Sequence, residues 1–264
     1  MHQPADERER GVRIRETQAS YNSGSQNARV WTEEWAAQWL YCPNCGTGRL
    51  TRFTANLPVA DLFCDSCSDQ YELKSKKGEF GAKIANGAYG KKIERLTSNT
   101  NPNFILLKYN LDRRMVLSVC MIPKHFFTPD IVEARPPLGP HARRAGWIGS
   151  NIVISHIPDA GRIYLVRDGV VTPKELVVSA WQRTRFLRDA DSNARGWLLD
   201  MMKCLDQLGR SEFDIGDAYS FERFLSQKYP NNSNVKPKIR QQLQYLRDRG
   251  YLEFIGRGRY RLTV

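Results

Sequence analysis

Apolar positions in the first two thirds of the chain come in short runs separated by turn residues, a pattern typical of β-strands. Asp168-Gly169 supplies a hairpin turn signal at the end of one of these runs. The pattern predicts strands at residues 49 to 53, 103 to 109, 114 to 122 and 161 to 169.

Two helices are predicted in the same part of the chain. Thr32 is a candidate N-cap, followed by two acidic residues and then by Trp35 and Trp39 on one helical face, where we expect both tryptophans to be core residues. A second helix is predicted across residues 82 to 96, and it carries Lys91 and Lys92.

From Asn193 the apolar positions recur at helical spacing, which predicts a different kind of domain. Three helices and a terminal hairpin at Gly256-Arg257-Gly258 form a winged-helix layout. The predicted helices span 195 to 208, 215 to 228 and 236 to 249, and the hairpin spans 251 to 262. We therefore expect an α/β (α+β) chain with a disordered lead-in at 1–20, a first domain at 21–182, a linker at 183–194 and a winged helix at 195–264.

Four cysteines form two Cys-x-x-Cys pairs, Cys42 with Cys45 and Cys64 with Cys67, separated by 18 residues. Four thiolates complete a tetrahedron around Zn²⁺ and leave no open position for a substrate, so this pattern predicts a structural zinc site. Four ordinary cysteines or two disulfides are the alternative. Cys120 and Cys204 lie in apolar runs and are predicted to be core residues.

The second cysteine pair is predicted to form the tip of a hairpin. With a symmetric register about that tip, Asp61 faces Gln70 and has Glu72 as its diagonal neighbour. Alternate side chains share a face of a strand, so Glu72 and Lys74 point the same way while the residues between and before them point to the other side. Asp61, Glu72 and Lys74 are therefore expected on one patch.

Two carboxylates on neighbouring strands repel each other unless a cation lies between them. Hard oxygen ligands suit Mg²⁺, which would polarise a phosphodiester oxygen and acidify a bound water, with Lys74 orienting that water. The patch thus predicts metal-assisted phosphodiester hydrolysis with Asp61 and Glu72 as magnesium ligands. A Glu-x-Lys triplet alone is also compatible with a solvated charged face on an edge strand.

The chain has 264 residues, of which 41% are hydrophobic and 26% charged, a globular composition long enough for two modest domains. A formal charge of +12 indicates a polyanionic partner, either nucleic acid or an anionic membrane surface. Because the chain lacks an apolar run of roughly 18 residues and a signal-peptide core, it is expected in a reducing cytoplasm and without a membrane partner. It is also expected to be a monomer.

A long loop punctuated by proline and glycine spans residues 135 to 149 and carries Arg143, Arg144 and Trp147. Long loops in compact domains are often functional. Paired arginines beside an exposed aromatic ring suit contact with phosphates and with a base or its methyl group. The alternative is an indole buried under the loop with two solvated arginines.

Positive charge in the second domain is confined to the third helix and the wing. Residues 195 to 235 hold five Lys/Arg against six Asp/Glu, whereas residues 236 to 261 hold eight against two. This segregation favours a helix in the DNA major groove, with a protein-binding winged helix as the alternative. The predicted DNA contacts are Lys238, Arg240, Gln241 and Gln244 on the helix and Arg257, Arg259 and Arg261 on the wing.

The order helix, three strands, helix, strand, with Asp61, Glu72 and Lys74 on the second and third strands, resembles the core of restriction-type nucleases with the PD-(D/E)XK motif. In this chain Pro58 lies three residues before Asp61 instead of next to it. That spacing departs from the motif as a string of residues but not as a geometry.

From about residue 21 to its end, the chain resembles the DpnI-type methyl-directed restriction endonucleases. The similar segments are Tyr-Cys-Pro-Asn-Cys-Gly at 41 to 46, Pro-Val-Ala-Asp at 58 to 61, Glu-Leu-Lys-Ser-Lys-Lys-Gly at 72 to 78, Ala-Arg-Arg-Ala-Gly-Trp-Ile-Gly at 142 to 149, Lys-Ile-Arg-Gln-Gln-Leu-Gln at 238 to 244 and Gly-Arg-Gly-Arg-Tyr-Arg at 256 to 261.

The resemblance implies Mg²⁺-dependent cleavage of both strands of double-stranded DNA at GATC sites whose adenines carry N6-methyl groups, by a zinc-containing nuclease domain with a winged helix. Asp61, Glu72 and Lys74 match its catalytic positions. Trp147 matches the aromatic residue with which the family senses the adenine methyl groups. The third helix matches a second, independent element with which the family recognises its DNA site. A zinc-ribbon and winged-helix transcription regulator without catalysis is the alternative, and a nuclease of the same fold with another target is a third possibility.

Overall fold

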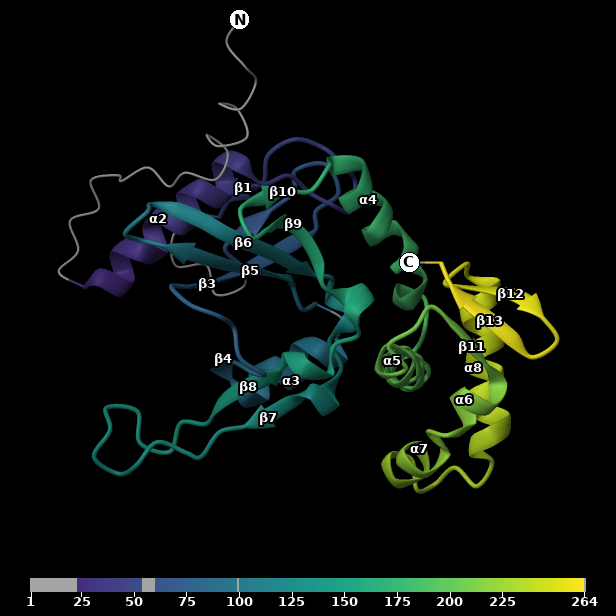
Figure 1. Cartoon of the computed structure of the whole chain (residues 1–264). Helices are drawn as coiled ribbons and strands as arrows, with labels where there is room; N and C mark the ends of the chain where they lie inside the picture. The colour runs from purple at the N-terminus through teal and green to yellow at the C-terminus, as the bar shows by residue number, and fades with distance from the viewer. Residues whose placement is uncertain (1–22, 54–59, 99, 264) are drawn as a thin grey trace, which may run out of the picture.

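The computed structural model describes residues 23–53, 60–98 and 100–263 of the chain. The predicted lead-in at 1–20 and Pro58 lie outside the described residues. A mixed α/β domain occupies the first part, and a helical domain with a small sheet follows it (Figure 1). Among the described residues no helix combines the length and the apolar character that crossing a membrane requires.

A seven-stranded sheet forms the centre of the first domain, in the order β1-β2-β3-β5-β6-β9-β10. β3 and β5 run parallel, and the other neighbouring strands run antiparallel. The strands are β1 (Thr51–Arg52), β2 (Leu62–Phe63), β3 (Gln70–Lys76), β5 (Asn103–Asn110), β6 (Met115–Ile122), β9 (Ile163–Arg167) and β10 (Val170–Val171). The strands predicted over 103–109, 114–122 and 161–169 are confirmed, while the one predicted at 49–53 is shorter.

The two faces of this sheet pack into different cores because side chains alternate along each strand. Tyr71, Ile105 and Leu107 face a cluster formed with α2 (Gly24–Trp39) and α4 (Lys174–Arg183). Phe104 and Leu106 face the opposite cluster, under α3 (Tyr89–Thr97). The face under α3 is therefore the one onto which Glu72 and Lys74 also project, because they pair in register with Phe104 and Leu106.

A second sheet of three antiparallel strands lies beside α3, in the order β4-β8-β7 (Figure 1). Its strands are β4 (Lys83–Ala88), β8 (Gly149–Val153) and β7 (Val132–Ala134). The helix predicted across 82–96 is thus wrong in its first half, where β4 replaces it. This extra strand also interrupts the predicted order of three strands before the helix.

The N-terminal helix α2 begins at Gly24, so the prediction that Thr32 caps it is wrong. Thr32 lies in the middle of the helix, where its hydroxyl donates to the carbonyl of Ala28 at 2.8 Å and contacts Ser75 Oγ at 3.0 Å. Trp35 is buried as predicted, but Trp39 at the end of the helix is 41% exposed and is not a core residue.

The second domain has the predicted winged-helix layout with two differences. The helix predicted at 215–228 is two helices, and a third strand adds to the terminal hairpin, giving a sheet in the order β11-β13-β12. The elements are α5 (Ser192–Gln207), β11 (Glu212–Asp214), α6 (Ile215–Tyr219), α7 (Glu222–Lys228), α8 (Val235–Asp248), β12 (Leu252–Gly256) and β13 (Arg259–Leu262). Short 3-10 helices elsewhere are η1 (Lys124–Phe126), η2 (Pro129–Ile131), η3 (Ile154–His156), η4 (Asp159–Gly161) and η5 (Arg185–Arg188).

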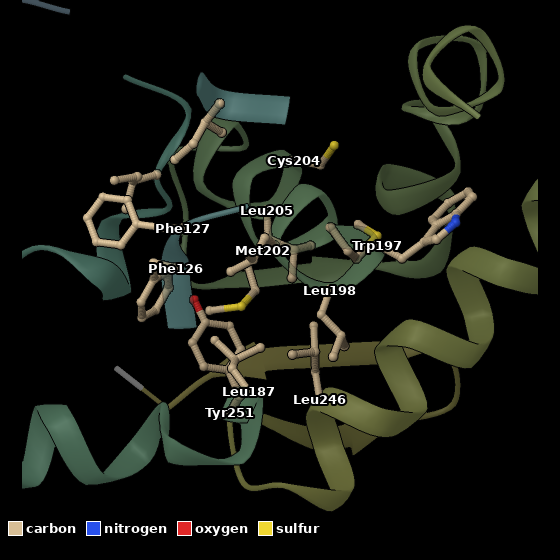
Figure 2. Packing of buried hydrophobic residues seen from close by; sticks show 14 of the residues in the cluster. Phe126, Phe127, Leu187, Trp197, Leu198, Met202, Cys204, Leu205, Leu246 and Tyr251 are labelled. Atoms are coloured by element: carbon tan, nitrogen blue, oxygen red, sulfur yellow. The ribbon is translucent and has the colours of Figure 1, made fainter. Parts of the chain in front are cut away.

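One hydrophobic cluster runs through both domains. Phe126 and Phe127 of the first domain belong to the same cluster as Leu187, in the segment predicted as a linker, and as α5 and Leu246 of the second domain (Figure 2). Cys120 and Cys204 are also buried in it, as predicted. The boundaries of the predicted domains remain a prediction, but the junction between them is packed.

Candidate active site and nucleic-acid interface

The hairpin formed by β2 and β3 has its tip at the second cysteine pair, as predicted, but its register differs from the symmetric one. Leu62 pairs with Tyr71 and Phe63 with Gln70. Asp61, directly before β2, does not face Gln70 as the symmetric register predicts, because Gln70 pairs with Phe63. The backbone amide of Asp61 donates to the carbonyl of Tyr71 at 3.0 Å. Leu62 is buried in the cluster on the α2 side of the sheet, so strand alternation puts Asp61 on the opposite face, which Glu72 and Lys74 also occupy.

The side chain of Asp61 is fixed to the neighbouring strand. Its Oδ2 accepts the backbone amide hydrogen of Leu73 at 2.7 Å, and its Oδ1 lies 3.3 Å from the guanidinium of Arg29 on α2. Burial raises the pKa of Asp61, and the negative charges of Glu33 and Glu72 raise it further, whereas the Leu73 amide and Arg29 lower it.

Glu72 and Lys74 point to the same face of β3, as predicted, with their side chains in contact. Lys74 Nζ lies 2.7 Å from Glu72 Oε1, and both side chains are partly buried. In this arrangement the ammonium of Lys74 offsets the charge of the Glu72 carboxylate.

The three residues line one cleft of about 810 Å³. Its floor is β3, and its walls come from Arg29 on α2, from β4 and from the basic side of α3. Carboxylate oxygens are the donors that Mg²⁺ prefers, so Asp61 and Glu72 are a chemically suitable pair of ligands. The size and the cationic walls of the cleft suit an anionic polymer better than a small apolar ligand.

Lys92 is a cleft residue whose character was missed in the sequence. It was predicted only as one of two helix lysines, yet it is 5% exposed and lies on the buried stripe of α3 with Leu96, four residues on. Burial lowers the pKa of Lys92 to about 8, with Glu72 opposing that shift and Arg95 and Lys74 adding to it. The sequence signal for its burial is its position four residues before Leu96 on an amphipathic helix, which becomes visible only once the helix is known to begin at Tyr89.

The four predicted cysteines converge into one cluster, whose Sγ atoms all lie within 4.8 Å of one another. Cys42 and Cys67 are 3.5 Å apart, and Cys45 and Cys64 are 3.6 Å apart. These spacings fit a tetrahedron with Zn–S bonds of about 2.3 Å, so the cluster is compatible with a structural zinc ion.

The backbone of the two cysteine turns is alike. Gly46 and Ser68, each following the second cysteine of a pair, have φ of 69° and 59°. Each donates its amide hydrogen to the backbone carbonyl of the first cysteine of its pair, Gly46 to Cys42 at 2.8 Å and Ser68 to Cys64 at 2.9 Å. This left-handed conformation strains Ser68, whereas Gly46 adopts it without a Cβ penalty.

Polar groups contact the sulfurs, although burial raises the pKa of Cys42 and of Cys67. The Asn44 side-chain amide donates to Cys67 Sγ at 3.4 Å, and the Thr47 hydroxyl contacts Cys45 at 2.9 Å. Burial alone would raise the pKa of Cys64, but hydrogen bonds from the Cys67 amide, the Thr47 hydroxyl and the Ser66 amide lower it to about 6. Ionised sulfurs are the form that binds metal.

The predicted loop at 135–149 is an arm that extends away from the second sheet (Figure 1). Backbone hydrogen bonds close its base, from the Leu138 amide to the Trp147 carbonyl at 3.0 Å and from the Arg135 amide to the Gly149 carbonyl at 2.9 Å. Arg143 and Arg144 are exposed on it, as expected for phosphate contact.

Trp147 is half-buried and lies directly over Gly149, where a Cβ would come within 2.8 Å of the indole ring. The ring is therefore neither fully exposed nor covered by the loop. Through the next residue the arm reaches α3, because the Tyr89 amide donates to the Ile148 carbonyl at 3.0 Å. A backbone hydrogen bond thus connects the arm to α3, the helix that lines the cleft.

On α8, Arg240, Gln241 and Gln244 are exposed while Ile239 and Leu243 are buried. The polar residues predicted to read bases therefore share the outward side of the helix. Lys238 is turned along the helix, since its Nζ donates to Gln241 Oε1 at 2.9 Å.

The wing arginines are not equivalent. Arg261 lies 2.8 Å from Glu212 and 3.3 Å from Glu253, and Arg259 lies 3.4 Å from Glu212, so acidic neighbours offset both charges. Arg257 is exposed in the turn between β12 and β13, and among the described residues no ion pair to it is found. The sequence predicts the same role for all three arginines, whereas the structure distinguishes them.

An α/β domain with a charged cleft and a four-cysteine cluster, joined to a helix-turn-helix domain, defines a two-domain DNA-acting protein. Residues 14–190 match the family model DpnI, described as the Dam-replacing family, and residues 193–262 match the Dam-replacing helix-turn-helix domain. The chain belongs to the DpnI family of methyl-directed restriction enzymes.

Proposed function

We propose that the chain is a type II, Mg²⁺-dependent endonuclease that hydrolyses both strands of double-stranded DNA at GATC sites containing N6-methyladenine. One observation carries this proposal: the Asp61 carboxylate accepts a hydrogen bond from the backbone amide of Leu73, the residue between Glu72 and Lys74. All three charged residues line the same basic cleft. Membership of the family supports the methyl-directed endonuclease class, and the cleft geometry supports the PD-(D/E)XK assignment of these residues.

In this proposal Asp61 and Glu72 hold the divalent ion, which when bound polarises the scissile phosphate and acidifies a water. The Leu73 amide and Arg29 keep the Asp61 carboxylate in place before substrate arrives. Lys74, ion-paired with Glu72 in the free protein, would orient the attacking water or stabilise charge that develops on the phosphate.

DNA recognition is assigned to the arm and to the second domain. Arg143 and Arg144 would contact phosphates while the indole of Trp147 packs against the adenine methyl groups. Burying one methyl contributes only about 1 kcal/mol, so reading both strands or reading the site twice would be needed for useful selectivity. Lys238, Arg240, Gln241 and Gln244 on α8 would provide the second reading, with Arg257 holding phosphate.

One gel tests the proposal. Plasmid DNA that is fully methylated, hemimethylated or unmethylated at GATC is incubated with the protein in Mg²⁺ and in EDTA. We expect double-strand cleavage of the methylated plasmid in Mg²⁺ only. Cleavage that ignores methylation would indicate another target for the same nuclease, and binding without any Mg²⁺-dependent cleavage would favour a non-catalytic regulator.

The role of Trp147 is tested with Trp147→Ala, which should lower the preference for methylated over unmethylated DNA by about fivefold per methyl read, equivalent to about 1 kcal/mol. Trp39→Ala is the matched control, because Trp39 is also a partly exposed tryptophan but lies on α2. An unchanged preference in Trp147→Ala would remove the indole from methyl recognition.

A further inference from the structure

Lys92 places a buried ammonium beside one of the proposed metal ligands. Its Nζ lies 4.6 Å from the centroid of the Phe104 ring and 5.4 Å from that of Phe127. Phe104 pairs directly with Glu72 in the register of β5 and β3, so their side chains are neighbours on one face of the sheet. The ammonium is therefore fixed over the sheet next to Glu72.

Burial at this position costs a lysine most of the hydration of its charge, so a functional role for the charge would explain why a lysine is found there. Two aromatic faces attract a cation, but they replace only part of the hydration that burial removes. A methionine would fill similar space without a charge to desolvate. Lys91, the adjacent residue, lines the same cleft but is exposed, so the chain contains both a buried and a solvated lysine at nearly the same place.

Glu72 already has one cation, because Lys74 is in contact with it. Because Lys92 lies over Phe104, the register partner of Glu72, the single carboxylate has two ammonium groups near it, one of them shielded from water. Coulomb attraction and repulsion act more strongly between buried groups than between exposed ones. A divalent cation approaching Glu72 must therefore overcome repulsion from Lys92.

We propose that Lys92 is a positioning residue that neutralises Glu72 in the DNA-free protein and keeps divalent-cation binding there weak until a DNA phosphate enters the cleft. The proposal rests on the proposed function, in which Glu72 is a metal ligand. An entering phosphate would offset the charge of both ammonium groups and leave the carboxylate free to bind the cation. Metal binding and DNA binding are then positively coupled, and by linkage each increases the affinity of the other equally.

The test is Mn²⁺ binding measured by isothermal titration calorimetry on the full chain, first without DNA and then with an uncleavable phosphorothioate duplex carrying a methylated GATC site. Lys92→Met should bind Mn²⁺ about tenfold more tightly than the wild type without DNA, and the added duplex should tighten its Mn²⁺ binding less. Lys91→Met loses the same charge from the solvated neighbour and should change the affinity by less than threefold.

Thermal unfolding without metal is the second measurement. Lys92→Met should melt at the wild-type temperature or above it, because it removes a buried charge. Lys92→Gln, which also removes the charge, should tighten Mn²⁺ binding as Lys92→Met does, even if the fit of the side chain alters the melting temperature. Equal Mn²⁺ affinity in the wild type and in both variants would overturn the proposal and leave Lys92 a packing role. Absence of Mn²⁺ binding by the wild type both with and without DNA would instead overturn the proposed function.

Discussion

The carboxylate of Asp61 accepts the backbone amide hydrogen of Leu73, the residue between Glu72 and Lys74, at 2.7 Å. The position of this acid is thereby determined by the backbone of the strand that carries its two partners. A slip of the hairpin by one residue would move Glu72 and Lys74 to the opposite face and break the bond at once. The position of Asp61 in the cleft therefore depends directly on the register of the hairpin.

Asp61→Asn should separate the charge of this residue from its structural role. The amide oxygen of asparagine can still accept from Leu73, so we expect the melting temperature to stay within a few degrees of the wild type. Cleavage of methylated plasmid should fall by about 10² to 10³, the range typical for losing one charge-stabilising group. Single-turnover cleavage and thermal unfolding measure the two effects.

Asp112→Asn is the matched control for Asp61→Asn, because Asp112 is 82% exposed and only loosely paired with Lys77, at 3.9 Å. Its cleavage rate should match that of the wild type. If Asp61→Asn cuts at the wild-type rate as well, Asp61 is not part of the reaction.

Removal of the four-cysteine site should unfold the region around the hairpin tip. Purified protein should contain one zinc per chain by atomic emission, and Cys45→Ser should lose most of it. Since structural zinc contributes folding free energy directly, we expect the melting temperature to fall by about 10 °C or more.

Cys120→Ala is the control for the zinc site. Cys120 is buried in the core and lies outside the four-cysteine cluster. This variant should be somewhat less stable yet still contain one zinc per chain. Full zinc content in Cys45→Ser would contradict the assignment of the cluster.

The wing should bind DNA through one arginine more than through its neighbours. Arg257→Ala should weaken binding to all DNA sequences and reduce the slope of log K against log salt by about 1, as expected for one lost phosphate contact. Arg261→Ala should change both quantities less, because Glu212 and Glu253 already offset its charge. Fluorescence anisotropy at several salt concentrations checks both variants, and a larger effect for Arg261→Ala would show that these ion pairs open on DNA.

The junction of the two domains should respond to pH through Asp206 on α5. Its Oδ2 accepts from the backbone amide of Asp159 in η4 at 2.8 Å, and burial, partly opposed by that hydrogen bond, raises the pKa of Asp206 to about 6. Because the folded-state pKa exceeds the ordinary value of 3.8, the folded state binds the proton more tightly. The stabilisation from protonation is complete at low pH and is lost as pH rises through 6.

Asp206→Asn should therefore raise the free energy of unfolding by about 1 to 2 kcal/mol at pH 7.5, after allowance for partial exposure, because the amide oxygen still accepts from Asp159 without a buried charge. The difference from the wild type should shrink towards pH 4. Urea unfolding at both pH values measures it, and a difference independent of pH would exclude this titration as the cause.

Much of the architecture follows from local patterns in the sequence. The buried strands, the turn at Asp168 and Gly169 and the helices of the second domain were predictable because each carries its own periodicity or turn chemistry. The segment at 83–88 was not, because β4 is a short, glycine-containing strand with Ile84 as its buried residue, and its pairing with β8 is a tertiary contact. Thr32 resembled a helix cap because two acidic residues follow it. Its hydroxyl instead bonds to the Ala28 carbonyl within the helix and to Ser75 on β3, and the contact with β3 is a tertiary one.

Within the candidate site, the motif residues could be found from spacing alone, but their surroundings could not. Strand alternation predicts Asp61, Glu72 and Lys74 on one face, whereas the observed register of Leu62 with Tyr71 and the hydrogen bond of Asp61 to the Leu73 amide could not be read from spacing. Lys92 required knowledge of which side of α3 is buried.

The hydrophobic cluster shared by both domains limits how the molecule can meet DNA. With Leu187 and α5 packed against Phe126 and Phe127, the second domain cannot swing on a tether. Heating should therefore produce one cooperative unfolding step, and a duplex bound by α8 as proposed would meet the proposed catalytic cleft at an angle fixed by the packing of the two domains.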